Sequence, residues 1–333
     1  MGIGLPAHAT GPRCPAAARG IVVPVTSDAI CDARRRYDRT SYRVAREVLA
    51  SYSTSFGLGA RLLGGRARAH VEAVYALVRG ADEIVDSRGG AGAGAALDEL
   101  RGQVADARAS GWSSNPVVHA FALTADRVGI TDAEIDPFFE SMAMDLTVTD
   151  HDRDSFERYV FGSAEVVGIM CLRVFLNGSR RPGEPLVEPD EVTVAGARAL
   201  GAAFQKINFL RDLAIDTQLG RSYFPGVTPQ TLDAEALDTI TTEIGADLTL
   251  ARAALPRLPG RPRAAIAATL ALYERLLAVL AATPPEQIVE RRVRVADAPK
   301  VFIAAQAVLL ESPWRAAGGG DAGGGDAAAE RSQ

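Results

Sequence analysis

Residues 205–216 read Gln-Lys-Ile-Asn-Phe-Leu-Arg-Asp-Leu-Ala-Ile-Asp. At the rotation of an α-helix, four polar side chains of this stretch fall within a sector about 80° wide. These four are Gln205, Asn208, Asp212 and Asp216, and Phe204 flanks them. The stretch therefore predicts a helix that presents two carboxylates and two amides on one face, beside an aromatic side chain.

A second stretch, residues 70–86, repeats this arrangement earlier in the chain. Tyr75, Arg79, Asp82 and Asp86 fall within a sector roughly 60° wide. Four valines border that sector, so the two acids lie beside the apolar stripe of the helix and not opposite it, where a solvated face is expected. The sequence thus predicts two helices whose acid pairs face a common interior.

Four carboxylates directed into one helical cavity repel one another strongly unless cations neutralise them. Oxygen ligands select a hard ion such as Mg²⁺, with Mn²⁺ as the alternative, and magnesium takes its remaining ligands from water and substrate phosphates. A single acid pair at this spacing is common on solvated helices, so the prediction depends on the two pairs occurring together. The predicted metal ligands are Asp82, Asp86, Asn208, Asp212 and Asp216.

The composition excludes several classes of protein. The chain has 333 residues, with 36 Lys and Arg against 41 Asp and Glu, and its net charge of -5 lacks the basic stripe that a nucleic-acid partner requires. The three cysteines and four histidines show no ligand spacing, which excludes a zinc site and a disulfide framework and fits a reducing cytoplasm. Hydrophobic residues make up 47% but aromatic residues only 6%, which favours an all-α protein.

The order of the segments predicts one large helical domain over residues 41–312. Residues 1–40 and the Gly/Ala/Asp-rich residues 313–333 are expected to be disordered. No apolar stretch reaches the roughly 20 residues that a bilayer span requires, and the N-terminus shows no secretory signal. The expected helices cover residues 41–63, 67–87, 93–109, 115–127, 132–147, 154–176, 189–217, 234–254, 261–281 and 298–311.

The acid motifs make the chain resemble the squalene and phytoene synthase family of head-to-head prenyltransferases over about residues 41–311. The resemblance is carried by D-x-x-x-D at 82–86 and by Q-x-x-N-x-x-R-D-x-x-x-D at 205–216, which Gly-Arg-Ser-Tyr-Phe-Pro at 220–225 follows. Ser-Thr-Ser-Phe at 53–56 matches a further family motif, and Tyr159 matches the tyrosine of Y-x-x-x-x-A-G-x-V-G. Glu83 replaces an aspartate of many members, and Glu165 replaces a glycine, which puts an acid near the expected cavity wall.

This resemblance implies an isoprenoid-synthase fold with a central cavity, and it implies a role for each matching residue. Magnesium held by the acid pairs is expected to bind the diphosphate. Tyr75 and Tyr159 are expected to stabilise the carbocations of the reaction. Either Tyr159 or the departing diphosphate is expected to accept the proton that is lost in the last step. Phe56, Val167, Met170 and Phe204 are expected to line a dry channel. The expected substrate-binding residues are Ser53, Ser55, Phe56, Arg79, Gln205, Asn208, Arg211, Arg221, Tyr273 and Arg292.

The residues around the motifs are more similar to those of bacterial phytoene synthases than to those of squalene synthases. It implies the joining of two geranylgeranyl diphosphates, through a cyclopropyl diphosphate, to phytoene in carotenoid biosynthesis, with no use of NADPH. The small residues Gly57, Gly59, Ala60 and Ala73 are expected to leave room for a long chain.

Three alternatives stay open. A squalene or dehydrosqualene synthase and a terpene cyclase use the same scaffold, and a non-catalytic assembly or lipid-binding protein is the alternative outside the enzymes.

The prenyl tails of the substrate also predict a peripheral membrane contact. The oligomeric state is not indicated by the sequence.

Overall fold

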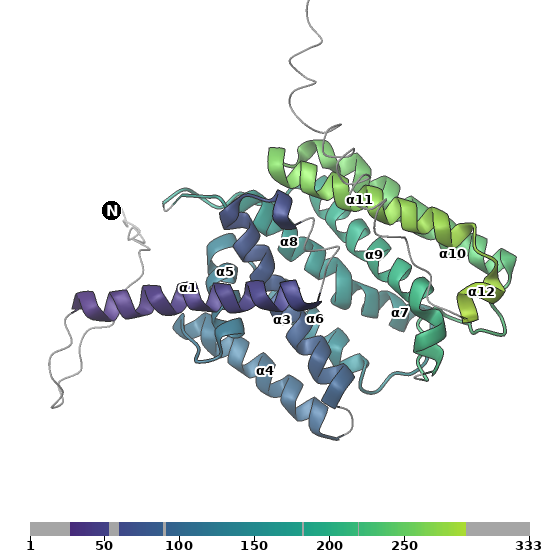
Figure 1. Ribbon diagram of the computed structural model, residues 1–333, viewed down its shortest axis with the longest axis horizontal. Helices are drawn as coiled ribbons and strands as arrows, with labels where there is room; N and C mark the ends of the chain where they lie inside the picture. The colour runs from purple at the N-terminus through teal and green to yellow at the C-terminus, as the bar shows by residue number, and fades with distance from the viewer. Residues whose placement is uncertain (1–26, 53–59, 89–90, 182, 219, 291–333) are drawn as a thin grey trace, which may run out of the picture.

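The computed structural model describes residues 27–52, 60–88, 91–181, 183–218 and 220–290, and it confirms the all-α prediction (Figure 1). Within these ranges the only strand-like pairing is an isolated bridge between Asp150 and Ser222. The helices are α1 (Ser27–Tyr52), α3 (Gly65–Arg88), α4 (Ala91–Ser110), α5 (Pro116–Val128), α6 (Asp132–Met144), α7 (Arg153–Val160), α8 (Val166–Asn177), α9 (Glu191–Gln218), α10 (Ala234–Ala254), α11 (Gly260–Ala281) and α12 (Pro285–Glu290), with a π-helical turn η1 (Phe161–Glu165) and a 3-10 turn η2 (Leu255–Arg257).

Local chemistry explains why helix ends lie close to their predicted positions. The Asn115 side chain accepts hydrogen bonds from the backbone N–H groups of the first turn of α5, and Gly129 ends that helix in the left-handed conformation. Thr131 and Glu134 form a reciprocal capping box at the start of α6. The predicted helix 154–176 is instead divided by η1 into α7 and α8, because the chain there makes one wider turn.

Helix α1 begins at Ser27 and not at residue 41, so the prediction of a disordered extension is wrong for residues 27–40. The Tyr37 hydroxyl donates to the carbonyl of Ser114 at 2.8 Å, and the Asp38 carboxylate contacts the buried His119 ring at 2.8 Å. These contacts hold the first turns of α1 to the loop before α5 and to α5 itself. The expected helix 298–311 and the tail 313–333 lie outside the described residues.

The cysteines differ from the reduced set that their spacing predicts. Cys31 of α1 is disulfide-bonded, whereas Cys171 of α8 is free. Burial raises the pKa of the Cys171 thiol to about 12, so this thiol is protonated at neutral pH.

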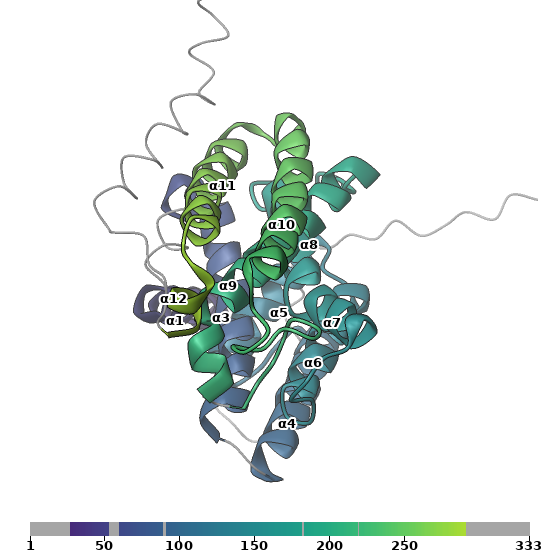
Figure 2. The same ribbon diagram turned by 90° about the vertical axis from the view of Figure 1, so that its right-hand side faces the viewer.

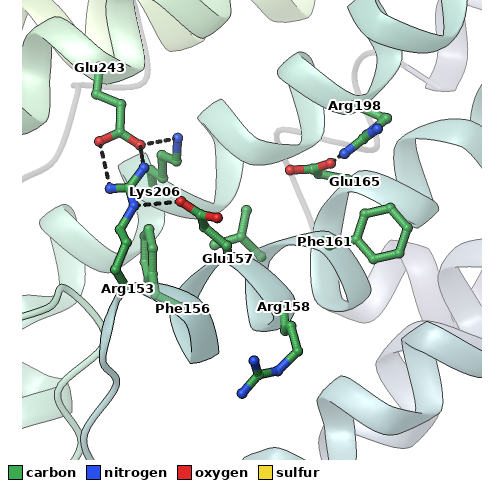
Figure 3. A pocket seen from close by; sticks show the side chains of 10 residues that line it. Arg153, Phe156, Glu157, Arg158, Phe161, Glu165, Arg198, Lys206 and Glu243 are labelled. Atoms are coloured by element: carbon green, nitrogen blue, oxygen red, sulfur yellow. Dashed lines mark hydrogen bonds and ion pairs between the residues drawn. The ribbon is translucent and has the colours of Figure 1, made fainter.

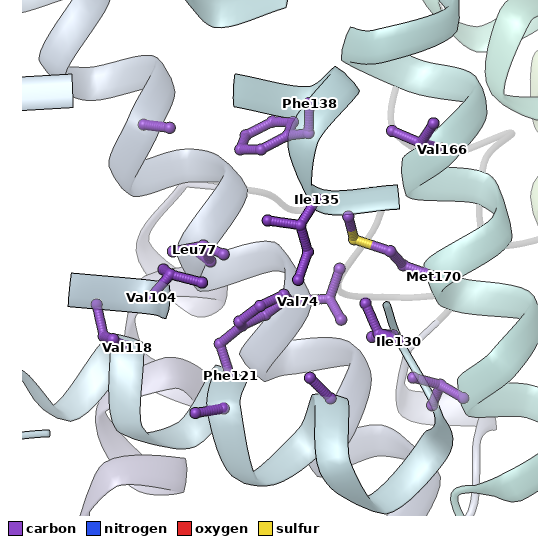
Figure 4. Close-up of a cluster of buried hydrophobic side chains, with 14 of the residues drawn as sticks. Val74, Leu77, Val104, Val118, Phe121, Ile130, Ile135, Phe138, Val166 and Met170 are labelled. Carbon is purple, nitrogen blue, oxygen red and sulfur yellow. The ribbon is translucent and has the colours of Figure 1, made fainter. Parts of the chain in front are cut away.

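Two hydrophobic cores divide the helical body. The first lies among α3, α4, α5, α6 and α8, and Figure 4 shows Leu77, Phe121, Phe138 and Met170 meeting there. The second lies among α7, α9, α10, α11 and α12. Seen from the side, α10 and α11 form a pair above α9 (Figure 2). Since α3 belongs to the first core and α9 to the second, the two predicted acid helices come from different halves of the molecule.

Two described segments, Arg153–Asn177 and Gly260–Ala281, are long and apolar enough to cross a bilayer by length and composition alone. The sequence analysis predicted no such segment. The core helix of a soluble protein meets the same criterion, and both segments contribute side chains to the hydrophobic cores.

Candidate active site

The last two turns of α3 and of α9 carry the two acid pairs, and the structure brings these helix ends together. The Arg221 guanidinium, which follows α9, forms an ion pair with Asp86 of α3 at 3.1 Å. The charge of Asp86 contributes to raising the pKa of Asp216 on α9. The opposed acid walls that the sequence predicts are therefore neighbours in the fold.

The carboxylates of this site are poorly neutralised. Burial raises the pKa of Asp82 to about 7, with smaller contributions from Asp86 and Asp145, while Arg79 opposes the rise. Burial and the neighbouring Asp212 raise the pKa of Asp216 to about 6. An added cation would favour the ionised form of both acids.

Asn208 provides a direct test of whether the residues fit a metal ion. Its side-chain oxygen is buried and has no hydrogen-bond donor, which leaves a free oxygen ligand on the acid face of α9. Within the described ranges, no group of three or more His, Cys, Asp or Glu side chains lies close enough together to hold a metal ion. The fit to Mg²⁺ rests instead on the chemistry of the donors: the unpartnered Asn208 oxygen and the carboxylates of the two acid pairs are hard oxygen ligands, of which Mg²⁺ uses one or two together with waters and substrate phosphates.

Two of the predicted diphosphate-binding arginines neutralise neighbouring acids. The Arg79 guanidinium forms an ion pair with Glu83 and lies 4.6 Å above the Tyr52 ring. The Arg211 guanidinium makes two hydrogen bonds to Asp212, one of them 3.0 Å long. Both cations are consequently at the site and held in place by carboxylates on their own helices.

An apolar cavity of about 220 Å³ follows the N-terminal half of α9 and ends at Gln205, the first residue of the acid face. From Phe204 and Gln205 it follows α8 and α9 and reaches Phe175 and Thr193 at its other end, with α10, η2 and α11 closing it. Gly168 permits the close approach of α8 to α9, since a Cβ there would lie 2.3 Å from the carbonyl oxygen of Ala197. The cavity matches the expected channel in character.

Only part of the predicted channel lining is confirmed. Val167 and Phe204 line the cavity. Met170 does not, because it points into the first core and is 1% exposed. The expectation for Ala73 is also wrong, since its methyl group is buried in a small cluster with Ala45, Ala76 and Ala120. Ala60 is buried as well, whereas Gly57 and Gly59 lie outside the described residues.

The backbone of Glu165 lies at the cavity wall, as expected, since it packs against Gly201, but its side chain turns away from the apolar cavity. Figure 3 shows its carboxylate turned toward Arg198 in a separate outer cleft, where the two groups pair at 2.7 Å. In the same cleft Lys206, which follows Gln205 on α9, pairs with Glu243 at 2.6 Å. The replacement of a glycine by Glu165 therefore alters the outer surface and leaves the cavity wall apolar.

The remaining predicted residues fall into two groups. Tyr273 of α11 stacks on Phe204, with ring centroids 3.7 Å apart, and Tyr75 is half-buried on α3. Ser53, Ser55, Phe56 and Arg292 lie outside the described residues, and their predicted roles stay predictions.

Sequence reasoning missed Asp145, which caps the C-terminal end of α6. The Tyr159 hydroxyl donates to one oxygen of this carboxylate at 2.8 Å, and the Tyr223 hydroxyl donates to the other at 3.3 Å. Burial raises the pKa of Asp145 to about 6. A single acid at a helix end carries no spacing signal, and its position was indicated only indirectly, by the predicted catalytic residue Tyr159 and by Tyr223 in the segment after the second acid motif.

An all-helical body in which two helices end in neighbouring acid pairs, with an apolar cavity behind one of them, defines the isoprenoid-synthase class of fold. The family model for squalene/phytoene synthase matches residues 49–298. The chain therefore belongs to the squalene/phytoene synthase family of prenyltransferases.

Curated relatives and solved structures agree with this assignment. The chain is 29% identical over 292 residues to a phytoene synthase of Mycobacterium tuberculosis, covering 80% of this chain and 90% of that protein. It is 33% identical over 210 residues to a chloroplastic phytoene synthase of Narcissus pseudonarcissus, covering 62% and 46%. A dehydrosqualene synthase structure shares the fold with a TM-score of 0.69 at 21% identity, covering 83% of this chain and 98% of that one.

Proposed function

We propose that this prenyltransferase is a magnesium-dependent phytoene synthase, which joins two geranylgeranyl diphosphates head to head through a cyclopropyl diphosphate. The observation that carries the proposal is the meeting of two acid pairs, each with one poorly neutralised carboxylate, near an apolar cavity. This arrangement suits a substrate with a diphosphate at one end and a hydrocarbon tail at the other. The phytoene synthases among the relatives support this choice of substrate and product.

The acid pairs and Asn208 are the residues that would hold Mg²⁺. When bound, the ion supplies electrostatic stabilisation of the charge that grows on the diphosphate as its allylic C–O bond breaks. Arg221 lies on the segment after α9 and reaches α3, so its guanidinium is placed to bind diphosphate oxygens between the two helices.

The apolar cavity supports the second half of the proposal. Its lining of small and aliphatic side chains from α8 and α9 keeps water from a prenyl tail and from the cations formed on it. The ring of Tyr159 can stabilise such a cation through its face. Either the Tyr159 hydroxyl or the departing diphosphate would accept the proton lost in the last step.

The test is incubation with farnesyl or geranylgeranyl diphosphate separately, with Mg²⁺ and with or without NADPH, followed by mass analysis of the hydrocarbon. The proposal expects a forty-carbon product from geranylgeranyl diphosphate that does not depend on NADPH. A thirty-carbon product from farnesyl diphosphate alone would instead identify a squalene or dehydrosqualene synthase. An absence of diphosphate release would identify a non-catalytic lipid-binding protein.

We further propose a peripheral membrane contact, since the prenyl tails of the substrates reside in bilayers. Flotation with phosphatidylcholine vesicles that carry geranylgeranyl diphosphate tests this contact. Protein that stays at the bottom of the gradient with such vesicles would contradict it.

A further inference from the structure

Asp145 is bound on both carboxylate oxygens by tyrosine hydroxyls from different parts of the chain. Tyr159 belongs to α7, whereas Tyr223 belongs to the segment that follows α9. Within the described residues no Lys or Arg forms an ion pair with Asp145, although the charges of Arg221 and Asp86 act on it. The carboxylate is thus placed to hold two phenols beside the acid site.

The fold brings Asp145 to Tyr159 by a close contact between α6 and η1. A Cβ at Gly162 would lie 2.2 Å from the Pro137 carbonyl oxygen and 2.7 Å from the Ser141 side chain. Only glycine allows this approach. Since Asp145 caps α6 and Tyr159 lies in the last turn of α7, just before η1, the contact brings the two residues together.

Tyr159 is buried in the second core, between the acid site and the turn that lines the apolar cavity. Its hydroxyl points to Asp145, which is close enough to Asp82 to raise the pKa of that acid. One turn further along the chain, Ser163 and Ala164 line the cavity. A substrate with its diphosphate at the acid pairs and its tail in the cavity would run past the turn of the chain that follows Tyr159.

Neighbouring rings hold Tyr159 in this position. The Tyr223 ring lies 5.3 Å from that of Tyr159 and stacks on Phe209 at 4.1 Å. His151, which is 3% exposed, packs against Tyr159 at 5.1 Å and against Tyr223 at 5.8 Å. These contacts restrict rotation of the Tyr159 ring. The hydrogen bond to Asp145 in turn fixes the direction of its hydroxyl group.

We propose that Asp145 is a positioning residue of the condensation: it holds the Tyr159 hydroxyl so that the ring of Tyr159 faces the carbocations formed at the reacting carbons. A negatively charged acceptor also increases the electron density of the phenol, which strengthens the attraction between its ring and a cation. This inference rests on the proposed prenyltransferase function and adds a residue outside the two acid motifs.

The test compares D145A, Y159F and the double variant, with E140Q as the control because Glu140 is exposed on the same helix. The readouts are kcat and KM for geranylgeranyl diphosphate and the ratio of cyclopropyl diphosphate to hydrocarbon. D145A is expected to lower kcat about ten- to a hundredfold, the effect of one hydrogen bond to a charged group, with KM changed less than about threefold. Because Asp145 acts through Tyr159, the double variant should be no slower than the slower single variant.

If D145A does not fold, D145N provides the same readouts with a side chain of the same shape. A folded D145A or D145N with wild-type kcat and product ratio would overturn the inference, as would losses that multiply in the double variant. These outcomes differ from a failure of the proposed function, in which the wild-type protein itself forms no condensed hydrocarbon.

Discussion

The acid pair of α3 and the acid pair of α9 share one spacing but lie in different surroundings. On α9, Arg211 holds Asp212 with two hydrogen bonds. On α3, the corresponding cation is Arg79. Its guanidinium is bound mainly to Glu83 and lies 3.8 Å from Asp82. The helices also differ behind their acids, since α3 is packed into the filled first core and α9 borders the apolar cavity.

This difference indicates a division of work between the halves of the molecule. The α3 pair contains the acid whose pKa is raised furthest, to about 7, so it has the most to gain from a bound cation. Each pair has an acid bound by an arginine, Asp212 by Arg211 and Asp86 by Arg221. Among the described residues, only the α9 half adds the space for a hydrocarbon tail. Repeated motifs therefore need not contribute equally to metal and substrate binding.

Removing one acid from each pair is the strongest way to break this comparison. D82N and D216N are each expected to lower kcat/KM about 10²- to 10³-fold, because each removes a group that positions charge against the diphosphate. D98N is the matched control, since Asp98 is exposed on α4. Steady-state assays across Mg²⁺ concentrations should show the larger increase in the magnesium requirement for D82N, and a larger increase for D216N would reverse the comparison.

Filling the space behind each acid helix tests the second difference. A197F adds a ring to the cavity beside α9 and is expected to reduce kcat/KM for geranylgeranyl diphosphate relative to farnesyl diphosphate by about ten- to a hundredfold. A73F adds the same ring to the small buried cluster of Ala73 with Ala45, Ala76 and Ala120, where overpacking destabilises the fold. Competition assays and thermal melts separate the two effects, and equal use of both substrates by A197F would contradict the assignment of the cavity.

Changing Arg221 tests the contact between the two halves, which is its ion pair with Asp86. R221A removes the ion pair with Asp86 and the diphosphate contact proposed for Arg221, so the KM for geranylgeranyl diphosphate should rise about tenfold. R221K keeps the charge but loses the two-pronged geometry of the guanidinium and should recover part of this loss. Steady-state kinetics give the answer, and an unchanged KM in R221A would place the diphosphate away from this residue.

The smallest expected effect is on stability. Asp82 and Asp216 have pKa values of about 7 and about 6 in the folded protein, above the ordinary value of 3.8. The folded state therefore binds these protons more tightly, and the stability they provide is present at low pH and lost as the pH rises through 6 to 7. Without metal, Tm should fall by a few degrees between about pH 5.5 and about pH 8.

Two additions identify the source of that fall. Mg²⁺ with inorganic diphosphate should remove most of it, because cations stabilise the ionised acids. D82N should flatten the pH dependence, whereas D98N should leave it as in the wild type. A melting temperature that does not depend on pH in the absence of metal would contradict the poor neutralisation of the α3 pair.

The sequence by itself determined the helices and the acid faces, because a helix repeats its side chains every 3.6 residues and this period can be read from the order of the residues alone. The predicted helix 234–254 coincides with α10, and the two acid pairs were found by the same rule. Val167 and Phe204, which line the cavity, stand at positions that the resemblance to the family identified.

Tertiary structure decided everything that depends on which helix faces which. Met170 and Val167 are both apolar residues of α8 that pack in the first core, yet only Val167 also lines the cavity. Asp145 reaches Tyr159 only because Gly162 lets α6 and η1 approach. Helical periodicity specifies the angle of a side chain around its own axis, whereas the neighbour it meets is set by the packing of distant segments.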